Sequence, residues 1–308
     1  MKRLVMLVSV AMKGMVLVPA GTCRMGSTEF YPEEAPLRDV AVGSVWVDEH
    51  PVTNAAFRRF VNDTGHVTVA ERPPDAADFP DADPTLLVPG SQVFTPTPGP
   101  VPLDDWTRWW RWVPGADWRH PEGPDTTLHG RELHPVVHVG LEDAQLYAEW
   151  AGKRLPTEAE WEHAARGGLA GARYAWGDEF MPRSRVMANT WHGQFPYQNL
   201  SPHGFTRTSP VKKFPPNGFG LFDVTGNVWE WTSTRWTADH ADGSAPEPSS
   251  PSCCGPQGSL GEHDRYVMKG GSHLCAPSYC HRYRPAARQA HGPRDTTSHL
   301  GFRCVRTD

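Results

Sequence analysis

Two cysteines near the C-terminus have a spacing that suits a two-sulfur site. Cys275 and Cys280 lie five positions apart within residues 269–288, KGGSHLCAPSYCHRYRPAAR. In a regular strand, residues five apart point to opposite faces, so the two sulfurs converge only if the chain bends, and Pro277 favours a bend. Converged sulfurs form a disulfide, a redox couple or a site for a soft metal, and two thiolates alone favour Cu(I) over zinc. Two cysteines that pack as small apolar groups are the alternative.

Two other stretches are rich in oxygen. The first oxygen-rich loop joins residues 188–191, which contain Asn189 and Thr190, with residues 203–205, which contain His203 and Phe205. The second oxygen-rich loop is the run DVTGNV at residues 223–228. Side-chain oxygens mixed with backbone carbonyls at turns suit Ca²⁺. Ordinary Asx turns produce the same pattern, so calcium is one of two interpretations.

A pair of histidines resembles a metal motif only superficially. His134 and His138 lie four positions apart, as metal ligands on a helix do. Pro135 and the valines between the two histidines indicate a strand, so the two rings do not share a helical face. The sequence therefore does not favour a metal site here.

Composition limits the classes of partner. The 308 residues include 30 Lys and Arg against 35 Asp and Glu, and this acidic balance argues against a nucleic acid or an anionic membrane as partner. The chain also has 29 Gly, 31 Pro and 13 Trp, which predicts loops and short elements pinned by large rings. Five of the tryptophans fall within residues 106–118, where an aromatic wall or a peptide groove is expected.

The chain is expected to form one domain, over residues 14–308. Residues 1–13 are a weak match to a signal peptide, because Lys13 interrupts a short apolar run, and they are taken as a non-structural leader. No stretch approaches the length needed to span a membrane. We therefore expect a cytoplasmic protein.

The elements that must position these residues are short. Residues 15–19 and 22–25 are expected to form a hairpin, and residues 40–47 a strand. Residues 73–102 carry many prolines and are expected to be irregular, and residues 238–264, with Cys253 and Cys254, form another inserted loop.

Three helices are expected before Gly168. The first begins after Thr53 and ends at Gly65. The second covers residues 142–150, with Leu146 and Trp150 facing inward. The third opens at Thr157, which has the spacing of a capping box with Glu160. Its buried stripe is expected to be Trp161, Ala164 and Ala165.

Several longer stretches resemble the formylglycine-generating enzymes of the sulfatase-modifying-factor family. They are GKRLPTEAEWEHAARGG, YAWGDEF, NGFGLFDVTGNVWEWT, the cysteine stretch and the terminal LGFRC. The resemblance covers residues 15–304 and implies an α+β fold, a variant of the C-type-lectin-like fold with little regular secondary structure and long loops. KRLPTEAEWE and GNVWEW are shared by the whole superfamily and indicate only the fold. The pair Cys275 and Cys280, in the context GGSxxCxxxxCxRYR, distinguishes the formylglycine-generating members.

The resemblance implies an oxidase that acts on another protein. A cysteine in a Cys-x-Pro-x-Arg segment of an unfolded sulfatase would become Cα-formylglycine, with O₂ and a thiol reductant. Cys275 and Cys280 would hold Cu(I), Ser272 would donate a hydrogen bond to the substrate sulfur, and Trp229 would form an apolar wall. Without the resemblance, the last two residues are a turn serine and a core tryptophan.

The resemblance also implies two structural calcium sites. The ligands implied for the first oxygen-rich loop are the Asn189 side chain and the carbonyls of Thr190 and Phe205. Relatives commonly place an acidic residue where this chain has His203, so this site lacks an anionic ligand. The ligands implied for the second oxygen-rich loop are the Asp223 side chain and the carbonyls of Val224, Gly226 and Val228. The second site is expected to be the firmer one.

The last cysteine is expected to be a free thiol. In relatives of the secretory pathway, the cysteine of the terminal GFRC forms a disulfide, but the partner position here is Ala165. Cys304 is then unpaired, as in a reducing cytosol.

Two other classes compete with the oxidase. A lectin-like binding module would use Cys275 and Cys280 as a structural disulfide. An iron-dependent sulfoxide synthase of the same superfamily would need an added helical-bundle domain, for which residues 1–14 offer no room. A monomer is expected, and the sequence names neither the sulfatase nor the reductant.

Overall fold

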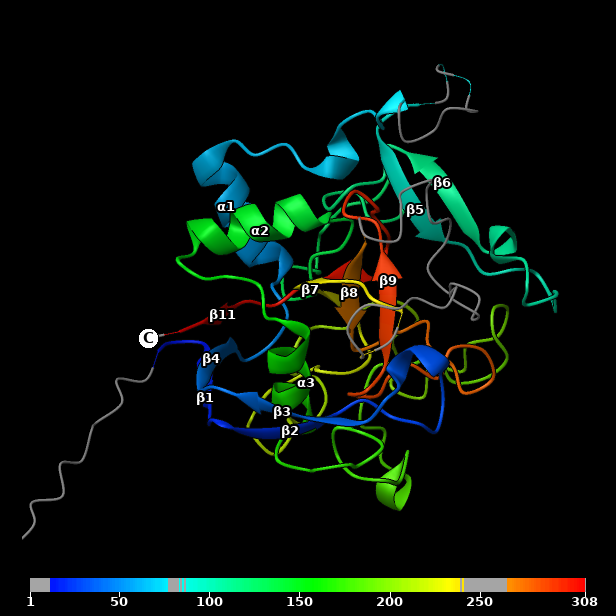
Figure 1. The fold of residues 1–308 in the computed structure, drawn as a ribbon. Coiled ribbons are helices and arrows are strands. Elements are labelled where there is room, and N and C mark those ends of the chain that lie inside the picture. Colours follow the sequence, from blue (N-terminus) through cyan, green and yellow to red (C-terminus); the bar gives the residue numbers. More distant parts are fainter. Residues whose placement is uncertain are drawn as a thin grey trace, which may run out of the picture.

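The computed structural model describes residues 12–76, 83, 85, 87–238, 240 and 265–307 (Figure 1). Within these residues the α-helices are α1 (Asn54–Thr64), α2 (Leu141–Trp150) and α3 (Glu158–Arg166). The strands are β1 (Met15–Val18), β2 (Gly21–Met25), β3 (Arg38–Val42), β4 (Val45–Asp48), β5 (Gly90–Phe94), β6 (Trp110–Pro114), β7 (Trp229–Arg235), β8 (Tyr266–Lys269), β9 (Arg288–His291), β10 (Leu300–Gly301) and β11 (Val305–Arg306). The short 3₁₀ helices are η1 (Pro32–Glu34), η2 (Val69–Glu71), η5 (Trp106–Arg108) and η6 (Pro182–Ser184).

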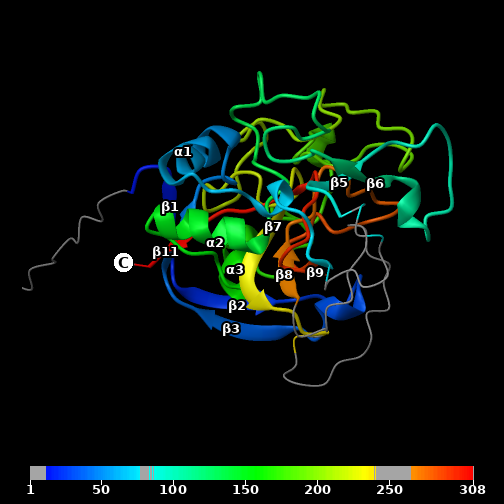
Figure 2. The ribbon, with the colours of Figure 1, turned by 90° about the horizontal axis from the view of Figure 1, so that it is seen from above.

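The strands form small sheets around a central one. The central sheet has the order β10-β7-β8-β9, in which β7 pairs antiparallel with β8 and parallel with β10. A second sheet has the order β1-β4-β11, and β2-β3 and β5-β6 are two-stranded ribbons. Helix α3 lies between the β2-β3 ribbon and the central sheet, while α1 and α2 lie side by side away from the β5-β6 ribbon (Figures 1 and 2).

Helix α1 begins and ends as the sequence predicts, and α3 begins where it predicts. The Thr53 hydroxyl accepts a hydrogen bond from the Ala56 N–H at 3.3 Å, and Gly65 ends α1 in the left-handed conformation at φ 70°. Thr157 and Glu160 form the reciprocal capping box of α3. The predicted buried stripe of α3 is confirmed, because Trp161, Ala164 and Ala165 are all buried.

The prediction that Leu146 and Trp150 face inward on α2 is wrong. Their exposed fractions are 38% and 39%, whereas Ala144 and Tyr147 are buried. The Tyr147 ring stacks on Phe57 of α1, with 5.9 Å between the ring centroids, and this contact sets the rotation of the helix. Leu146 and Trp150 lie at the rim of the α1–α2 contact for that reason.

The predicted hairpin of residues 15–19 and 22–25 does not form. β1 pairs with β4, and β2 pairs with β3, so the chain changes sheets at Pro19 and Ala20. Pro19 lacks the N–H that would continue a ladder. The predicted single strand at residues 40–47 is likewise two strands, β3 and β4, which separate at Gly43 and Ser44 and belong to different sheets.

The stretch of residues 73–102 is not irregular throughout, because it contains β5. Val93 and Phe94 of β5 are buried, and Phe94 pairs with Trp110 of β6 in the ladder. The tryptophan-rich segment therefore supplies the second strand of a ribbon, which packs Trp109 and Trp110 against Leu274 and Ala276.

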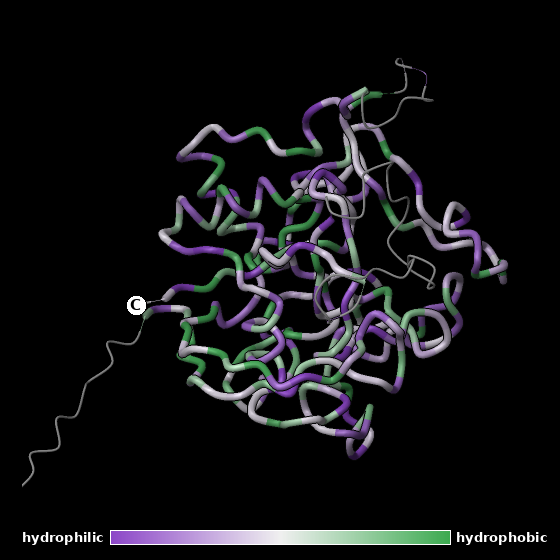
Figure 3. The backbone as a smooth tube through the Cα atoms, viewed as in Figure 1, coloured by the Kyte–Doolittle hydropathy of each residue, from purple (hydrophilic) through white to green (hydrophobic). Residues whose placement is uncertain are grey.

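Apolar and polar residues alternate over short distances along the described part of the chain (Figure 3). No single long element supplies the core. The largest core cluster instead gathers α1 and α2 with Trp229, Trp231 and both cysteines, Cys275 and Cys280. Of the expected site residues, Trp229, Cys275 and Cys280 are thus part of the principal core.

Candidate active site

The two cysteines converge as a bent segment allows. Residues 276–280 form a tight turn in which the Cys280 N–H donates to the Ala276 carbonyl at 2.9 Å, and Pro277 lies at the exposed apex. The Sγ atoms of Cys275 and Cys280 are 3.0 Å apart, and each residue is only 1% exposed. A disulfide measures about 2.0 Å, so the two sulfurs are in contact without being bonded.

The chain crosses itself just before the first cysteine. Gly271 has φ 67°, and a Cβ built on it would lie 2.7 Å from the Arg282 carbonyl, so only glycine fits. Ser272 follows, and its N–H donates to Cys275 Sγ at 3.4 Å while its carbonyl accepts from the Cys275 N–H at 3.0 Å. The segment after the second cysteine thereby holds the segment before the first in place.

Ser272 and Trp229 both lie beside the sulfur pair, and both contact a residue that the sequence analysis did not single out. The Ser272 Oγ is 2.8 Å from His299 Nδ1, and the Trp229 N–H donates to the His299 carbonyl at 2.8 Å. Trp229 is fully buried, and its Nε1–H has no acceptor among the described residues. The signal available in the sequence was the position of His299, directly before the LGFRC motif.

The residues around the sulfurs fit a soft monovalent metal better than zinc. Trp229, Tyr283 and both cysteines share one apolar cluster, and burial raises the pKa of Tyr283 above its usual range. No group of three or more His, Cys, Asp or Glu side chains in the described residues is arranged to hold a metal ion. A site with two thiols and no third His, Cys, Asp or Glu ligand among the described residues suits Cu(I), whereas zinc needs about four ligands.

The first oxygen-rich loop fits calcium poorly. Asn189 Oδ1 is buried and has no donor among the residues that the structure describes. The Phe205 N–H, however, donates to His203 Nδ1 at 3.2 Å, which leaves the proton on Nε2, and Nε2–H donates to the Thr190 carbonyl at 3.4 Å. Burial lowers the pKa of His203. The neutral His203 ring therefore donates a hydrogen bond to the Thr190 carbonyl, which was expected to bind the ion.

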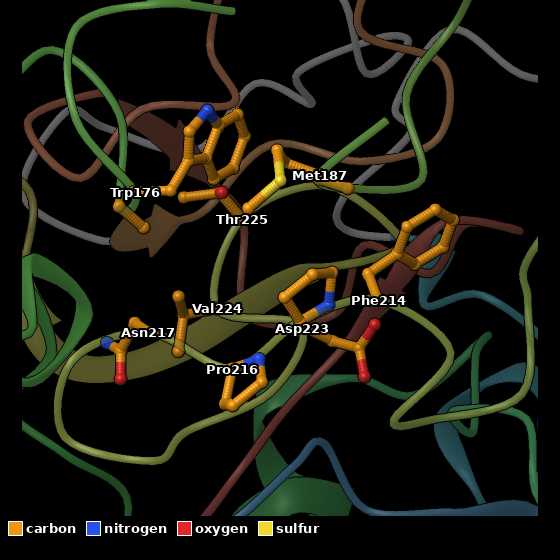
Figure 4. Close-up of a pocket in the computed structure, with 11 residues that line it drawn as sticks. Trp176, Met187, Phe214, Pro216, Asn217, Asp223, Val224 and Thr225 are labelled. Atoms are coloured by element: carbon orange, nitrogen blue, oxygen red, sulfur yellow. The ribbon is translucent and has the colours of Figure 1, made fainter. Parts of the chain in front are cut away.

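The second oxygen-rich loop fits a hard cation better. Asp223 is buried, and its pKa is raised to about 6 by burial, against the opposing effect of the Lys212 N–H that it accepts at 2.8 Å. The Arg303 Nη2 donates to the Asp223 carbonyl at 3.1 Å rather than to its carboxylate. Asp223 lines a small pocket together with Val224 and Thr225 (Figure 4). A bound cation would offset the cost of burying the charged form of this carboxylate.

The two oxygen-rich loops and the cysteine segment lie in direct contact. The Asn227 N–H donates to the Asn189 carbonyl at 2.8 Å, and the Asn227 carbonyl accepts from the His273 N–H at 3.0 Å. A Cβ on Gly226, which has φ 75°, would lie 2.5 Å from the Asn189 carbonyl oxygen. All the pieces that the sequence singled out for chemistry, Val228 and Trp229 included, thus form one continuous region.

The histidine pair forms no such site. The predicted strand is wrong, since only Pro135 makes a bridge, with Thr53, and His138 has φ 61°. His138 contacts Ser91 Oγ and the Pro121 carbonyl, and burial lowers its pKa to about 4. It is a buried structural histidine.

Two of the remaining cysteines lie within the described residues. Cys304 is a buried free thiol whose pKa is raised by burial, as is Cys23. Cys253 and Cys254 lie outside the described residues.

These features define an α+β enzyme fold of the variant C-type-lectin-like type. The profile of the "Sulfatase-modifying factor enzyme 1-like domain" matches residues 3–308. A formylglycine-generating enzyme of Mycobacterium tuberculosis is 55% identical over 94% of this chain and 97% of its own length, and one of Mus musculus is 45% identical over 96% and 75%. The structure of PvdO from Pseudomonas aeruginosa superposes with a TM-score of 0.62 at 25% identity, covering 96% of this chain and 94% of that one. The chain belongs to the sulfatase-modifying-factor family, and these two relatives in it are formylglycine-generating enzymes.

None of the helices in the described part of the chain is long and apolar enough to cross a bilayer.

Proposed function

We propose that this chain oxidises a cysteine in a Cys-x-Pro-x-Arg segment of a sulfatase to Cα-formylglycine. The observation that carries the proposal is the pair of buried sulfurs, 3.0 Å apart, with Ser272 and Trp229 beside them. Relatives at 55% and 45% identity are formylglycine-generating enzymes, which supports the same reaction here.

The reaction balances with O₂ and a thiol reductant. The substrate CH₂–SH group becomes an aldehyde, CHO, and its sulfur leaves as H₂S. One oxygen atom enters the aldehyde and the other leaves as water. Two thiols of the reductant supply two electrons and two protons and become a disulfide.

Cys275 and Cys280 would hold Cu(I), which supplies O₂ activation and a soft binding site for the substrate sulfur. The chain's own residues do the rest. Ser272 donates a hydrogen bond to the sulfur, and the apolar cluster around Trp229 and Tyr283 excludes water. The tight turn of residues 276–280 keeps the two thiols together before any substrate binds.

An aromatic cluster beside the cysteine segment supports recognition of an extended peptide. Tyr279, between the two cysteines, stacks on Phe195 with 4.5 Å between ring centroids and meets the Trp109 ring edge-on at 5.4 Å. Trp109 and Phe195 are buried, so the partly exposed Tyr279 ring is the aromatic surface that this cluster offers to the proline of the substrate segment. An unfolded sulfatase presents that segment in an extended form.

The second oxygen-rich loop would hold a structural Ca²⁺ through Asp223 and neighbouring carbonyls. The raised pKa of Asp223 supports this, because a cation would stabilise its charged form. The first oxygen-rich loop would hold none, since His203 contacts the Thr190 carbonyl instead.

Mass spectrometry of a synthetic peptide tests the reaction. A peptide containing Cys-x-Pro-x-Arg is incubated with the protein, Cu(I), O₂ and a thiol, and the expected product has the mass change of CH₂–SH to CHO. A peptide with Ser in place of Cys and an anaerobic sample are the controls. Absence of the aldehyde in the complete mixture would contradict the proposal, and a reduced protein that binds no Cu(I) would favour a binding module.

A further inference from the structure

We propose that His299 is a positioning residue that donates a hydrogen bond from Nδ1–H to Ser272 Oγ and so leaves the serine proton for the sulfur site. The inference rests on the proposed function, in which Ser272 is a donor to the substrate sulfur. It adds a residue and a protonation state to that function.

The contacts of the Ser272 hydroxyl make the histidine decisive. A serine hydroxyl has one proton and two lone pairs. The Leu274 N–H donates to Ser272 Oγ at 3.2 Å and occupies one lone pair, while His299 Nδ1 lies 2.8 Å away on another side. If Nδ1 carries no proton, the serine hydroxyl donates its hydrogen bond to the imidazole. If Nδ1 carries the proton, both lone pairs are filled, and the hydroxyl can donate only to a third group.

Solvent cannot accept the Ser272 hydroxyl proton, because both side chains are buried. Ser272 is fully buried and His299 is 1% exposed. The His299 ring packs edge-on against Trp110, with 4.9 Å between the ring centroids, so its plane is held by an aromatic neighbour. A buried hydroxyl proton needs an acceptor in the protein or in a bound ligand. Since the Ser272 N–H already contacts Cys275 Sγ, the sulfur site is the neighbouring place for such an acceptor.

The backbone of His299 ties the same residue to Trp229. Its carbonyl accepts the Trp229 N–H at 2.8 Å, and the next residue, Leu300, pairs with Trp229 in the parallel ladder of β10 and β7. His299 therefore fixes the tryptophan through its backbone and the serine through its side chain. This double attachment is what suits it to position the two residues relative to each other.

Nitrogen NMR of the histidine rings tests the protonation state directly. The chain has 15 histidines, and His299→Asn assigns the ring signals by the set that disappears. In the reduced, metal-free protein we expect the His299 signals of a ring protonated on Nδ1, and Ser272→Ala should shift that Nδ1 signal. A ring protonated only on Nε2 would overturn the proposal. This measurement needs no turnover, so its result does not depend on the proposed reaction.

Matched variants test the consequence for turnover. His299→Asn keeps an N–H donor close to the position of Nδ1, whereas His299→Leu has a similar size and no donor. We expect the kcat of His299→Leu to fall roughly tenfold to a hundredfold with little change in KM, which is the size of one lost hydrogen bond to a charged group. We expect His299→Asn to keep most of the wild-type kcat. Thermal unfolding of both variants controls for a loss of fold.

A double variant separates positioning from general damage. If His299 acts through Ser272, His299→Leu should add little to the loss already caused by Ser272→Ala. The proposal would be overturned if the loss of kcat in the double variant equalled the product of the losses in the two single variants. Equal losses for His299→Leu and His299→Asn would also overturn it. If the wild-type protein fails to convert the peptide, the proposed function itself is wrong, and the NMR result then stands alone.

Discussion

On the inner face of α3, Glu158 and Glu162 are buried with one cation from α3 itself and two from distant parts of the chain, and both carboxylates are paired. Lys269 Nζ lies 2.9 Å from Glu162 Oε2, Arg166 Nη2 lies 2.7 Å from Glu162 Oε1, and Arg288 forms two hydrogen bonds with Glu158. We call these five residues the buried ion network. Burial alone would raise the pKa of Glu162, but the charges of Lys269 and Arg166 outweigh it and hold the pKa below its ordinary value.

The cysteine site is equally buried, but it is not held by ion pairs of the kind found in the buried ion network. Its sulfurs contact each other without a bond, and the Trp229 Nε1–H has no acceptor among the described residues. Fully paired charges stabilise one conformation, whereas a buried donor such as the Trp229 Nε1–H, which has no acceptor among the described residues, is typical of a place where a ligand binds. The contrast predicts that damage to one region affects mainly stability and damage to the other mainly activity.

The largest expected effect is the loss of turnover in Cys275→Ser. A hydroxyl is a poor ligand for a soft metal, so peptide conversion should fall below detection even with added copper. The free energy of unfolding should drop by only about 1–3 kcal/mol, the range for an unsatisfied buried polar group. Peptide mass spectrometry and urea unfolding measure the two quantities. Activity near the wild-type level would refute a two-thiol site.

The second effect is on stability, in Glu162→Gln. This change leaves the buried Lys269 and Arg166 without their main counter-charge, and breaking a buried ion pair costs about 3–5 kcal/mol. Arg173→Ala is the matched control, because the ion pair of Arg173 with Glu29 is exposed and should contribute less than about 1 kcal/mol. Urea unfolding checks both. Equal losses in the two variants would remove the distinction between buried and exposed pairs.

The third effect is a pH dependence that originates at Asp223. Its pKa is about 6 in the folded chain and about 4 when unfolded, so between these values the folded state binds the additional proton. Asp223 alone therefore removes about 3 kcal/mol of stability from calcium-free protein as pH rises from 4 to 6, whereas His138 and other buried histidines with a lowered pKa add stability over the same range. The test is the difference between two proteins: relative to Asp223→Asn, the wild type should lose stability as pH rises, and added Ca²⁺ should reduce that loss. Thermal unfolding of both proteins across this pH range is the measurement, and parallel profiles would contradict the assignment.

The smallest effect is expected at His203. Its neutral ring already contacts the Thr190 carbonyl, so His203→Ala should change the response of the melting temperature to a calcium chelator very little. Asp223→Ala should instead make the melting temperature insensitive to the chelator. A large and equal change in both variants would mean that the two oxygen-rich loops bind calcium alike.

Several features of the fold could be predicted because they depend on a few neighbouring residues. Thr53 and Gly65 bound α1, and Thr157 begins α3, since capping needs only one side chain and the adjacent backbone. The inward face of α2 could not be predicted in this way. Leu146 and Trp150 are apolar, but the contact between Tyr147 and Phe57 decides the rotation of the helix.

The candidate site divides in the same manner. The sequence established the spacing of Cys275 and Cys280 and the family that these motifs indicate, whereas the need for glycine at position 271 became clear only in the structure. Tertiary structure alone decided which strands pair, that His299 meets Ser272, and that Lys269 meets Glu162 across 107 positions of the chain. The difference comes from the distance along the sequence over which each interaction acts. Turns and caps follow from backbone geometry over a few residues, whereas pairings between distant segments follow from how the whole core packs.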